Sequence, residues 1–437
     1  MKSGIKIFRA KNIITMHPEN PSAEAVAVLD GRILATGEAA GLAYHLNQSG
    51  FGPYEIDDRF QSKVLMPGIV DPHTHVEIQA FIYSGNFVSR IPWPDPNGGF
   101  FTVYPTKQDV IGRLKALDQA LPPGELLYGV AYDDNKAGPF HISELNAVSD
   151  TRPVLVSNLV FHRFWCNSFL LKKAGINRDH LPAGVKVGSD GEPDGTLIEA
   201  HGLLAVAPWM LGFFDGLKEK ISHILPLFYA AGNTTVCDAA LGSAFGCQIV
   251  LDAVNEAQSL CCRPDIRHRM DHCHSITEAQ LRKAKALGVN VQFFTPQLYY
   301  YGDTHTRLLG PDRARHLTPV GTAKRIGVSW GFHNDPPGTP QLPWVGAYAI
   351  VNRLTCETKT LLGPEHRGTI GEALRAMTIE AAFQMHMDHE IGSIEAGKKA
   401  DFCVLEKDPL KMAPEEIKDM PVWGTVFGGV PMKAGKR

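Results

Sequence analysis

The stretch Val64-Leu65-Met66-Pro67-Gly68-Ile69-Val70-Asp71-Pro72-His73-Thr74-His75 decides the fold that we expect for this chain. An apolar run that leads into two histidines one residue apart indicates a buried β-strand. In an extended chain, residues i and i+2 point to the same face, so His73 and His75 face the same way. Two imidazoles side by side suit a divalent metal ion. The stretch therefore predicts a strand that ends in two metal ligands.

The composition is that of an ordinary globular protein. The chain has 437 residues, which suggests one large or two unequal domains. Hydrophobic residues make up 44% and charged residues 20%. Lys and Arg number 43 against 46 Asp and Glu, for a formal charge of −3. This balance favours neither nucleic acid nor an anionic membrane as partner.

Cysteine usage and the start of the chain indicate a cytoplasmic protein. Eight cysteines occur without a CxxC motif, and Cys261 is adjacent to Cys262. We therefore expect reduced thiols. The segment 1–6 lacks a long apolar run, and no segment approaches the length of a membrane helix.

Both ends of the chain are strand-like. Segments 6–16 and 23–37 alternate apolar and polar residues, with Asp30-Gly31 as a tight turn. Near the C-terminus, 400–405 and 422–427 repeat the pattern, followed by a Gly428-Gly429 turn. We therefore expect the strands of the two ends to pair in one composite β-sandwich domain made of residues 1–66 and 392–437.

The middle of the chain, residues 67–391, alternates strand and helix patterns, which predicts parallel strands in an α/β fold. We expect strands at 64–70, 126–131, 154–160, 234–239, 266–272, 289–294 and 327–332, and helices at 106–120, 246–260, 277–287 and 370–387. Their number favours a (β/α)8 TIM-like barrel, distorted or with one strand missing, since seven strands are found where eight are usual. The long aromatic segment 77–105 is either a binding loop or a structural excursion on the rim.

Polar side chains recur where the expected strands end. His73 and His75 follow one strand, His162 another, and His272 a third, with His274 two residues later. His333, Asn334 and Asp335 close the strand at 327–332. In a parallel barrel, reactive side chains gather at the C-terminal ends of the strands. We therefore expect several of these residues to share one site.

The residue types suggest metal-assisted hydrolysis. Neutral imidazoles hold Zn²⁺, Mn²⁺ or Fe²⁺, and a carboxylate completes such a site. A metal-bound water with its pKa lowered towards about 7 supplies hydroxide at neutral pH. Asp335 is our candidate for the group that orients this water and passes its proton to the leaving group.

Taken together, the motifs resemble those of the amidohydrolase superfamily, in its amidohydrolase-3 or YtcJ-like branch, which includes N-substituted formamide deformylases. The resemblance rests on 25–33, 66–75, 152–154 leading to His162, 167–168, 190–199, 269–272, 334–336 and 392–401. It implies a (β/α)8 barrel with a small terminal β-sandwich. It also implies metal ligands at His73, His75 and His272 and a metal-and-base role for Asp335. Glu199 is, by resemblance, a ligand where other members use a carboxylated lysine, or else a carboxylate that stabilises a helix start.

The chain departs from this branch at 239–243. Relatives usually carry there a strand that ends in a histidine within a HAxGD-like block, whereas this chain reads Ala-Ala-Leu-Gly-Ser. A long insert common in relatives is also absent. Two hypotheses follow: the site holds one divalent metal rather than two, or another residue replaces the missing ligand. The candidate replacements are His162, Asp238, His268 and His274.

These observations predict a metal-dependent hydrolase that cleaves the C–N bond of an amide, formamide or cyclic amide. Aromatic residues near the strand ends suggest a small-molecule substrate with an apolar or aromatic group, with His162, Tyr299 and Trp344 as substrate contacts. A deaminase, lactonase, decarboxylase or isomerase could use the same metal site. A non-catalytic homologue is a further alternative, and a homo-oligomer is possible.

Overall fold

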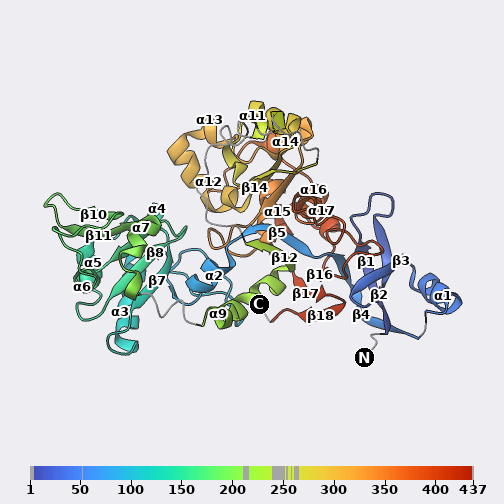
Figure 1. Cartoon of the computed structure of the whole chain (residues 1–437), viewed down its shortest axis with the longest axis horizontal. Coiled ribbons are helices and arrows are strands. Elements are labelled where there is room, and N and C mark those ends of the chain that lie inside the picture. The colour runs from blue at the N-terminus through green and yellow to red at the C-terminus, as the bar shows by residue number, and fades with distance from the viewer. Residues whose placement is uncertain are drawn as a thin grey trace. The chain divides into compact units, whose positions relative to one another are not determined.

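The structure is a computed structural model in which the chain forms two compact units (Figure 1). It describes residues 4–51, 53–209, 216–238, 251, 254–256, 258–259 and 265–435. The first unit comprises Met1–Thr74, Phe228–Asp335 and Gln341–Gly435, and the second comprises His75–Leu227 and Pro336–Pro340. These units differ from the predicted domains, which are a β-sandwich of residues 1–66 and 392–437 and a barrel of residues 67–391. The predicted domains stay a prediction.

The two ends of the chain pair with each other, as the sequence predicts, and together they form one seven-stranded sheet. Its order is β18-β17-β16-β4-β1-β2-β3. The strands are β1 Ile5–Ile14, β2 Ser22–Leu29, β3 Arg32–Gly37, β4 Tyr54–Pro67, β16 Phe402–Leu405, β17 Val422–Phe427 and β18 Val430–Lys433. The expected turn between β2 and β3 is present, since Asp30 and Gly31 both have positive φ. The N- and C-terminal strands meet where β16 runs antiparallel to the end of β4.

The terminal strands form one continuous hydrogen-bonded sheet among the described residues, and its arrangement as a two-layer sandwich stays a prediction. The 14-residue strand β4 is long enough to pair with both β1 and β16, and it joins what would otherwise be two sheets. One core cluster contains Val26 of β2, Phe60 of β4 and Phe402 of β16, so the sheet curls around a shared core. Helix α1, Ala39–Ser49, covers the other face through Leu42 and Leu46.

Parallel strands alternate with helices in the rest of the first unit, which confirms an α/β arrangement. Strand β5 pairs with β12, and β13, β14 and β15 form a second parallel sheet whose last strand packs beside β5. The strands are β5 Ile69–Thr74, β12 Asn233–Asp238, β13 Arg269–Met270, β14 Asn290–Phe294 and β15 Trp330–His333. The helices include α9 Leu217–Ala231, α11 Glu278–Ala286, α12 Pro296–Leu309, α13 Pro311–Ala314, α14 Val320–Ile326, α15 Pro343–Asn352, α16 Ile370–Ala376 and α17 Ile379–Gln384. These strands do not form a closed barrel within the part of the chain that the structure describes, and a closed barrel stays a prediction.

Two predicted elements of this unit are divided in the structure. The apolar run 64–70 is split at Gly68, so that 64–67 belong to β4 and the metal-site strand begins at Ile69. The expected helix 370–387 becomes α16 and α17, because Met377 and Thr378 leave the helical conformation between them. Residues 239–243 and most of the expected helix 246–260 lie outside the described residues.

The second unit is built on a six-stranded sheet of order β10-β11-β9-β8-β7-β6. The strands are β6 Asn86–Phe87, β7 Leu127–Tyr132, β8 Val154–Asn158, β9 Arg163–Cys166, β10 Val185–Val187 and β11 Pro193–Ile198. The predicted helix appears as α3, Lys107–Ala120, which starts with a capping box at Thr106. The aromatic segment 77–105 packs on itself, because Phe87 stacks on Phe101 at 4.3 Å and Trp93 is 1% exposed. This packing favours the structural alternative for that segment.

No helix among the described residues has both the length and the apolar character needed to cross a bilayer.

Gly68 allows β5 to approach β12 closely, and replacing it should destabilise the first unit. A Cβ on Gly68 would lie 1.9 Å from Oγ1 of Thr234, so backbone or side chain must shift. We expect Gly68→Ala to lower the free energy of unfolding by about 1–3 kcal/mol, the usual cost of overpacking. Chemical unfolding measures this. The matched control is Gly41→Ala in α1, where a Cβ meets nothing within 4 Å and should stabilise the helix slightly. Equal loss in both variants would contradict this account.

Candidate metal centre

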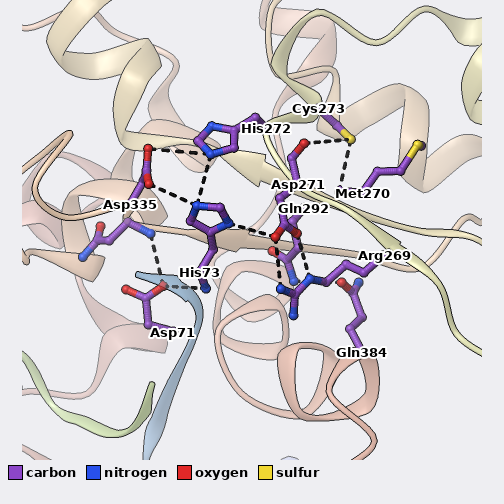
Figure 2. A network of polar contacts seen from close by, with 11 residues as sticks. Asp71, His73, Arg269, Met270, Asp271, His272, Cys273, Gln292, Asp335 and Gln384 are labelled. Carbon is purple, nitrogen blue, oxygen red and sulfur yellow. Dashed lines mark hydrogen bonds and ion pairs between the residues drawn. The ribbon is translucent and has the colours of Figure 1, made fainter. Parts of the chain in front are cut away.

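Three of the predicted ligands converge in the first unit. His73 is in β5, His272 follows β13, and Asp335 lies two residues beyond β15. Each contributes a ligand atom to a group in which all these atoms lie within 4.8 Å of one another. Figure 2 shows the two imidazoles and the carboxylate pointing toward one another, His73 from β5 and the other two from the segments that follow β13 and β15. The convergence follows from the parallel sheet, whose strands end at one edge.

The spacing of these atoms fits one metal ion. The Nε2 atoms of His73 and His272 are 3.2 Å apart. The Asp335 carboxylate lies 3.3 Å from Nε2 of His73 and 3.8 Å from Nε2 of His272. Ligand atoms about 2.0–2.1 Å from a tetrahedral zinc ion are themselves about 3.3 Å apart. The donor set of two imidazoles and one carboxylate is also one that Zn²⁺, Mn²⁺ and Fe²⁺ accept.

Two of the candidate ligands have an unusual backbone conformation. The φ angles of His272 and Asp335 are 57° and 52°, in the left-handed region. Outside glycine, this conformation costs roughly 1–2 kcal/mol per residue. Such residues persist where the surrounding structure holds them, and they occur often at functional sites. The fold therefore turns both side chains back toward His73 at a cost in stability.

Polar groups behind the ligands orient His73 through a contact with Nδ1, the ring nitrogen that faces away from the metal site. Oδ2 of Asp271 lies 2.8 Å from Nδ1 of His73, so that Nδ1 donates and Nε2 is left to face the metal site. Arg269 donates from Nε and Nη2 to the two oxygens of Asp271, at 2.7 and 3.0 Å (Figure 2). Neither Asp271 nor Arg269 had a predicted role, although both belong to the motif at 269–272. Their positions next to a predicted ligand were the available signal.

Asp71 fastens β5 to the turn that carries Asp335. Its Oδ1 accepts long hydrogen bonds from the backbone N–H groups of His73 and Asn334, both at 3.4 Å. Its Oδ2 accepts from Nε2 of Gln341 at 3.3 Å, and Gln341 also donates to Asn233 of β12. Asp71 is buried, and burial raises its pKa to about 6. The Asp71 carboxylate therefore links β5 to the turn after β15, and Gln341 connects it to the start of β12.

Burial and the carboxylates of Asp271 and Asp335 shift the pKa of His73 in opposite directions. Burial alone would lower the pKa of His73, but the contacts with Asp271 and Asp335 raise it to about 9. Burial would likewise raise the pKa of Asp271, but the hydrogen bond from His73 and the Arg269 guanidinium hold it well below its usual range. Both shifts arise because His73 lies against carboxylates, and a bound cation would replace the imidazole proton at Nε2.

His333 is a buried imidazole beside the ligands. Its ring centroid lies 4.6 Å from that of His73 and 4.8 Å from that of His272, and its ring stacks on Phe294. Neither ring nitrogen makes a hydrogen bond with the described residues. Burial and the two neighbouring histidines lower the pKa of His333 well below its usual value, so the ring is neutral. With Phe294, it forms an aromatic wall on one side of the centre.

Three other predicted site residues lie in the second unit. His75 caps the start of α2, Val76–Ile82, immediately after β5. Glu199 begins α7, Glu199–Leu204, with a φ of 56°. His162 lies near it, with its Nδ1 3.0 Å from Oε2 of Glu199, and both side chains are more than half exposed. The roles of His75, Glu199 and His162 in metal or substrate binding stay predictions.

The two predicted aromatic substrate contacts pack in the core. Trp344 in α15 is 2% exposed and belongs to the large hydrophobic cluster of the first unit. Tyr299 in α12 packs against the same cluster and against the ring of Tyr348. This packing gives both residues a structural role, since a side chain enclosed by apolar neighbours has little surface left for a ligand. Their contact with substrate stays a prediction.

The proposed replacements for the missing histidine are not brought into this group among the described residues. The ring of His274 lies parallel to that of His305, at 6.5 Å, and burial lowers its pKa to about 4. The backbone carbonyl of His268 accepts a hydrogen bond from Asn290, where β13 meets β14. Residues 239–243 and the side chain of Asp238 lie outside the described part of the chain.

A protein-family model described as "Amidohydrolase family" matches residues 61–246 and 246–432. The match extends over most of the chain and includes all three converging ligands. The chain therefore belongs to the amidohydrolase family. Within it, YtcJ-like proteins and N-substituted formamide deformylases are homologues over nearly its full length, as the sequence motifs predict.

Two curated relatives show the extent of the similarity. The putative amidohydrolase YtcJ of Bacillus subtilis is 28% identical, over 97% of this chain and 98% of that protein. The N-substituted formamide deformylase of Arthrobacter pascens is 22% identical, over 96% of each. The alignments run over 543 and 542 positions, more than the 437 residues of this chain. Both relatives therefore contain positions with no counterpart in this chain, and the absence of one long insert stays a prediction.

A solved structure supports the fold. The crystal structure of an uncharacterized metal-dependent hydrolase from Pyrococcus horikoshii matches with a TM-score of 0.66 and 16% identity. The match covers 94% of this chain and 99% of that one. At this identity, the similarity is evidence for the fold alone.

Proposed function

We propose that this protein is a metal-dependent hydrolase that cleaves the C–N bond of an amide, formamide or cyclic amide. The observation that carries the proposal is the convergence of His73, His272 and Asp335 within 4.8 Å at the ends of parallel strands. Membership of the amidohydrolase family supports the reaction type. Fold and family alone do not define a substrate. The proposed substrate class therefore depends on the residues around the site and on the tests described below.

Each residue has a role in this proposal. His73 and His272 would hold the ion through Nε2, with Asp335 as the carboxylate ligand. When bound, such an ion lowers the pKa of a water molecule towards about 7 and polarises a carbonyl oxygen. Asp335 would accept the proton of the attacking water and deliver it to the leaving nitrogen. Asp271 would keep His73 in the tautomer that binds through Nε2.

The ion in this proposal is Zn²⁺, with Mn²⁺ and Fe²⁺ as alternatives, in one or two copies per chain. Two imidazoles and a carboxylate suit all three ions. His75 and Glu199 are the proposed sources of further ligands, and a second ion would need them. We also propose a cytoplasmic protein, a closed barrel and a possible homo-oligomer, in keeping with the composition and the family.

The proposed substrate is a small molecule with an apolar or aromatic group. The aromatic wall of His333 and Phe294 beside the ligands supports this class. Because one relative is named N-substituted formamide deformylase, N-substituted formamides are the first compounds to test. Cyclic amides come next, since a protein named imidazolonepropionase is 23% identical over 87% of this chain.

Removing the metal should abolish the activity and restoring it should recover it. We expect that dialysis against a chelator reduces turnover to background, because the three ligands alone cannot activate water at neutral pH. Addition of Zn²⁺, Mn²⁺ or Fe²⁺ in separate samples then identifies the ion that restores the rate. Full activity in protein shown to be metal-free by elemental analysis would contradict a metal-dependent mechanism.

A panel of substrates separates the proposal from its alternatives. Release of formate or another acid with an amine from amides supports the proposed reaction. Ammonia from amino-heterocycles, or hydrolysis of lactones alone, would instead show a deaminase or a lactonase. Decarboxylation or isomerisation of the same compounds would be equally distinct. A chain that binds no metal and converts none of them would be a non-catalytic homologue.

A further inference from the structure

A second cluster of metal-binding side chains lies in the first unit, formed by residues distinct from His73, His272 and Asp335. His316 follows α13, and Glu365 and His366 lie in the 3-10 helix η3, Pro364–His366. Their ligand atoms all lie within 4.8 Å of one another. His316 and Glu365 are exposed, whereas His366 is 5% exposed. The cluster therefore has a fixed inner residue and an open outer side.

The two imidazoles have the spacing of ligands on one ion. Nδ1 of His316 lies 3.4 Å from Nε2 of His366, and the rings are inclined at 68°. Nitrogens bound to a tetrahedral zinc ion are about 3.3 Å apart. The same distance also fits a hydrogen bond between two neutral rings, so the spacing alone does not decide. The groups around the rings do.

The inner imidazole is oriented as metal-bound histidines are. Nδ1 of His366 lies 3.3 Å from Oγ1 of Thr322 in α14. If Nδ1 carries the proton and donates it to this hydroxyl, Nε2 keeps its lone pair and faces His316. A hydrogen bond at one ring nitrogen that orients the other is the usual arrangement around metal sites.

A buried arginine holds together the two loops that carry the cluster. Arg353 is fully buried and donates to the carbonyl oxygens of Leu317, Thr318 and Leu362. These carbonyls adjoin His316 on one loop and η3 on the other. The approach is tight, because a Cβ on Gly321 of α14 would lie 2.4 Å from the carbonyl oxygen of Glu365. The cluster is therefore organised by the protein without an ion.

The open side of the cluster faces a cavity of about 700 Å³. Its lining includes His316, Glu365 and His366 together with Thr277, Leu309 and Pro319. A tetrahedral ion held by two imidazoles and one carboxylate keeps a fourth position for water or for a small ligand. The cavity gives that position access to solvent.

We propose that His316, Glu365 and His366 form a second, peripheral site for Zn²⁺ or a similar divalent transition metal, which fastens the loop after α13 to η3. The same loop contacts the region near His272, since the backbone N–H of Thr318 donates to the carbonyl of His274 at 2.6 Å. The site is independent of the proposed hydrolase function, because it shares no ligand with the centre at His73.

Neighbouring guanidinium groups oppose the metal, since Arg353 and Arg325 act electrostatically on His366 and Arg315 pairs with Glu365. Nη2 of Arg315 lies 3.0 Å from Oε1 of Glu365, so this guanidinium competes for the carboxylate. Both side chains are substantially exposed, which makes the ion pair weak. An ion at the cluster would take the carboxylate from Arg315. Removing Arg315 should therefore strengthen zinc binding, an effect that a purely structural pair of histidines would not show.

Zinc titration of metal-free protein tests the site. Equilibrium dialysis with elemental analysis should show one equivalent of zinc fewer in His316→Ala than in the unaltered protein. Glu365→Gln should weaken this equivalent by at least about tenfold, and Arg315→Ala should strengthen it. His316 and Glu365 are exposed, so both variants should fold. Zinc should also raise the thermal unfolding midpoint less in His316→Ala than in the unaltered protein.

The matched control is His389→Ala, which removes an exposed histidine of the same unit. It should bind as much zinc as the unaltered protein. The proposal is overturned if His316→Ala and His389→Ala bind equal amounts of zinc with equal affinity. Loss of the centre at His73 would leave this comparison intact, so the two metal sites are tested separately.

Discussion

Replacing Asp335 with asparagine should abolish turnover while the metal ion stays bound. Asparagine has nearly the shape of aspartate and keeps one oxygen that can face the ion, but it cannot accept a proton at neutral pH. In the structure the Asp335 carboxylate lies 3.3 Å from Nε2 of His73, so it is placed beside the proposed ion and its bound water. We expect kcat/KM to fall by about 10²–10⁴-fold, the usual contribution of a general acid–base group.

Metal content and activity must be measured on the same Asp335→Asn sample. The expected result is near-normal metal by elemental analysis together with background turnover. Asp419→Asn is the matched control, since Asp419 is an exposed aspartate of the same unit that pairs with Lys418. Near-normal activity of Asp335→Asn with the metal in place would remove Asp335 from the mechanism. Loss of both metal and activity would show that Asp335 acts chiefly as a ligand.

Much of the fold could be predicted from local pattern. The alternating strands at both ends, with turns at Asp30-Gly31 and Gly428-Gly429, predicted that the two ends pair in one β domain, and the terminal strands do share a sheet. The division of the apolar run at 64–70 into two strands was not predicted. Hydrophobic periodicity does not show where a chain leaves one sheet and pairs with a strand of another. The chain crosses at Gly68 from a strand of the terminal sheet to β5. That crossing depends on contacts with Thr234, which are distant in sequence.

The sequence predicted the metal ligands that lie at or just after the ends of strands, but not the residues that orient them. His73, His272 and Asp335 come together because parallel strands end at one edge, which sequence order alone suggests. The positioning groups were not assigned, since the contact of Asp271 with His73 joins residues 198 positions apart. The substrate contacts predicted at Tyr299 and Trp344 stay predictions, although both side chains pack against the core. An aromatic residue near a strand end looks the same in sequence whether it lines a pocket or fills the core.

Replacing Asp271 with asparagine should weaken metal binding by about 10–100-fold, the scale measured when a residue that orients a metal ligand is lost. Asp271 accepts the Nδ1 proton of His73 and neutralises Arg269. Asparagine would leave the Arg269 guanidinium, which is only 17% exposed, without its counter-charge beside the centre. That uncompensated positive charge opposes a divalent ion. At saturating metal, kcat should change much less than the metal affinity.

A second ion pair of the same geometry provides the control. Arg267 contacts Asp265 at 2.7 Å from Nε and 3.0 Å from Nη2, as Arg269 contacts Asp271, but Asp265 touches no metal ligand. Asp265→Asn should therefore leave metal affinity unchanged. The double variant Asp271→Asn with Arg269→Gln should recover part of the lost affinity, because it removes the unpaired cation. If the double variant binds metal no better than Asp271→Asn, the loss comes from the orientation of His73 rather than from charge. If Asp271→Asn itself binds normally, Asp271 does not position His73 for the ion.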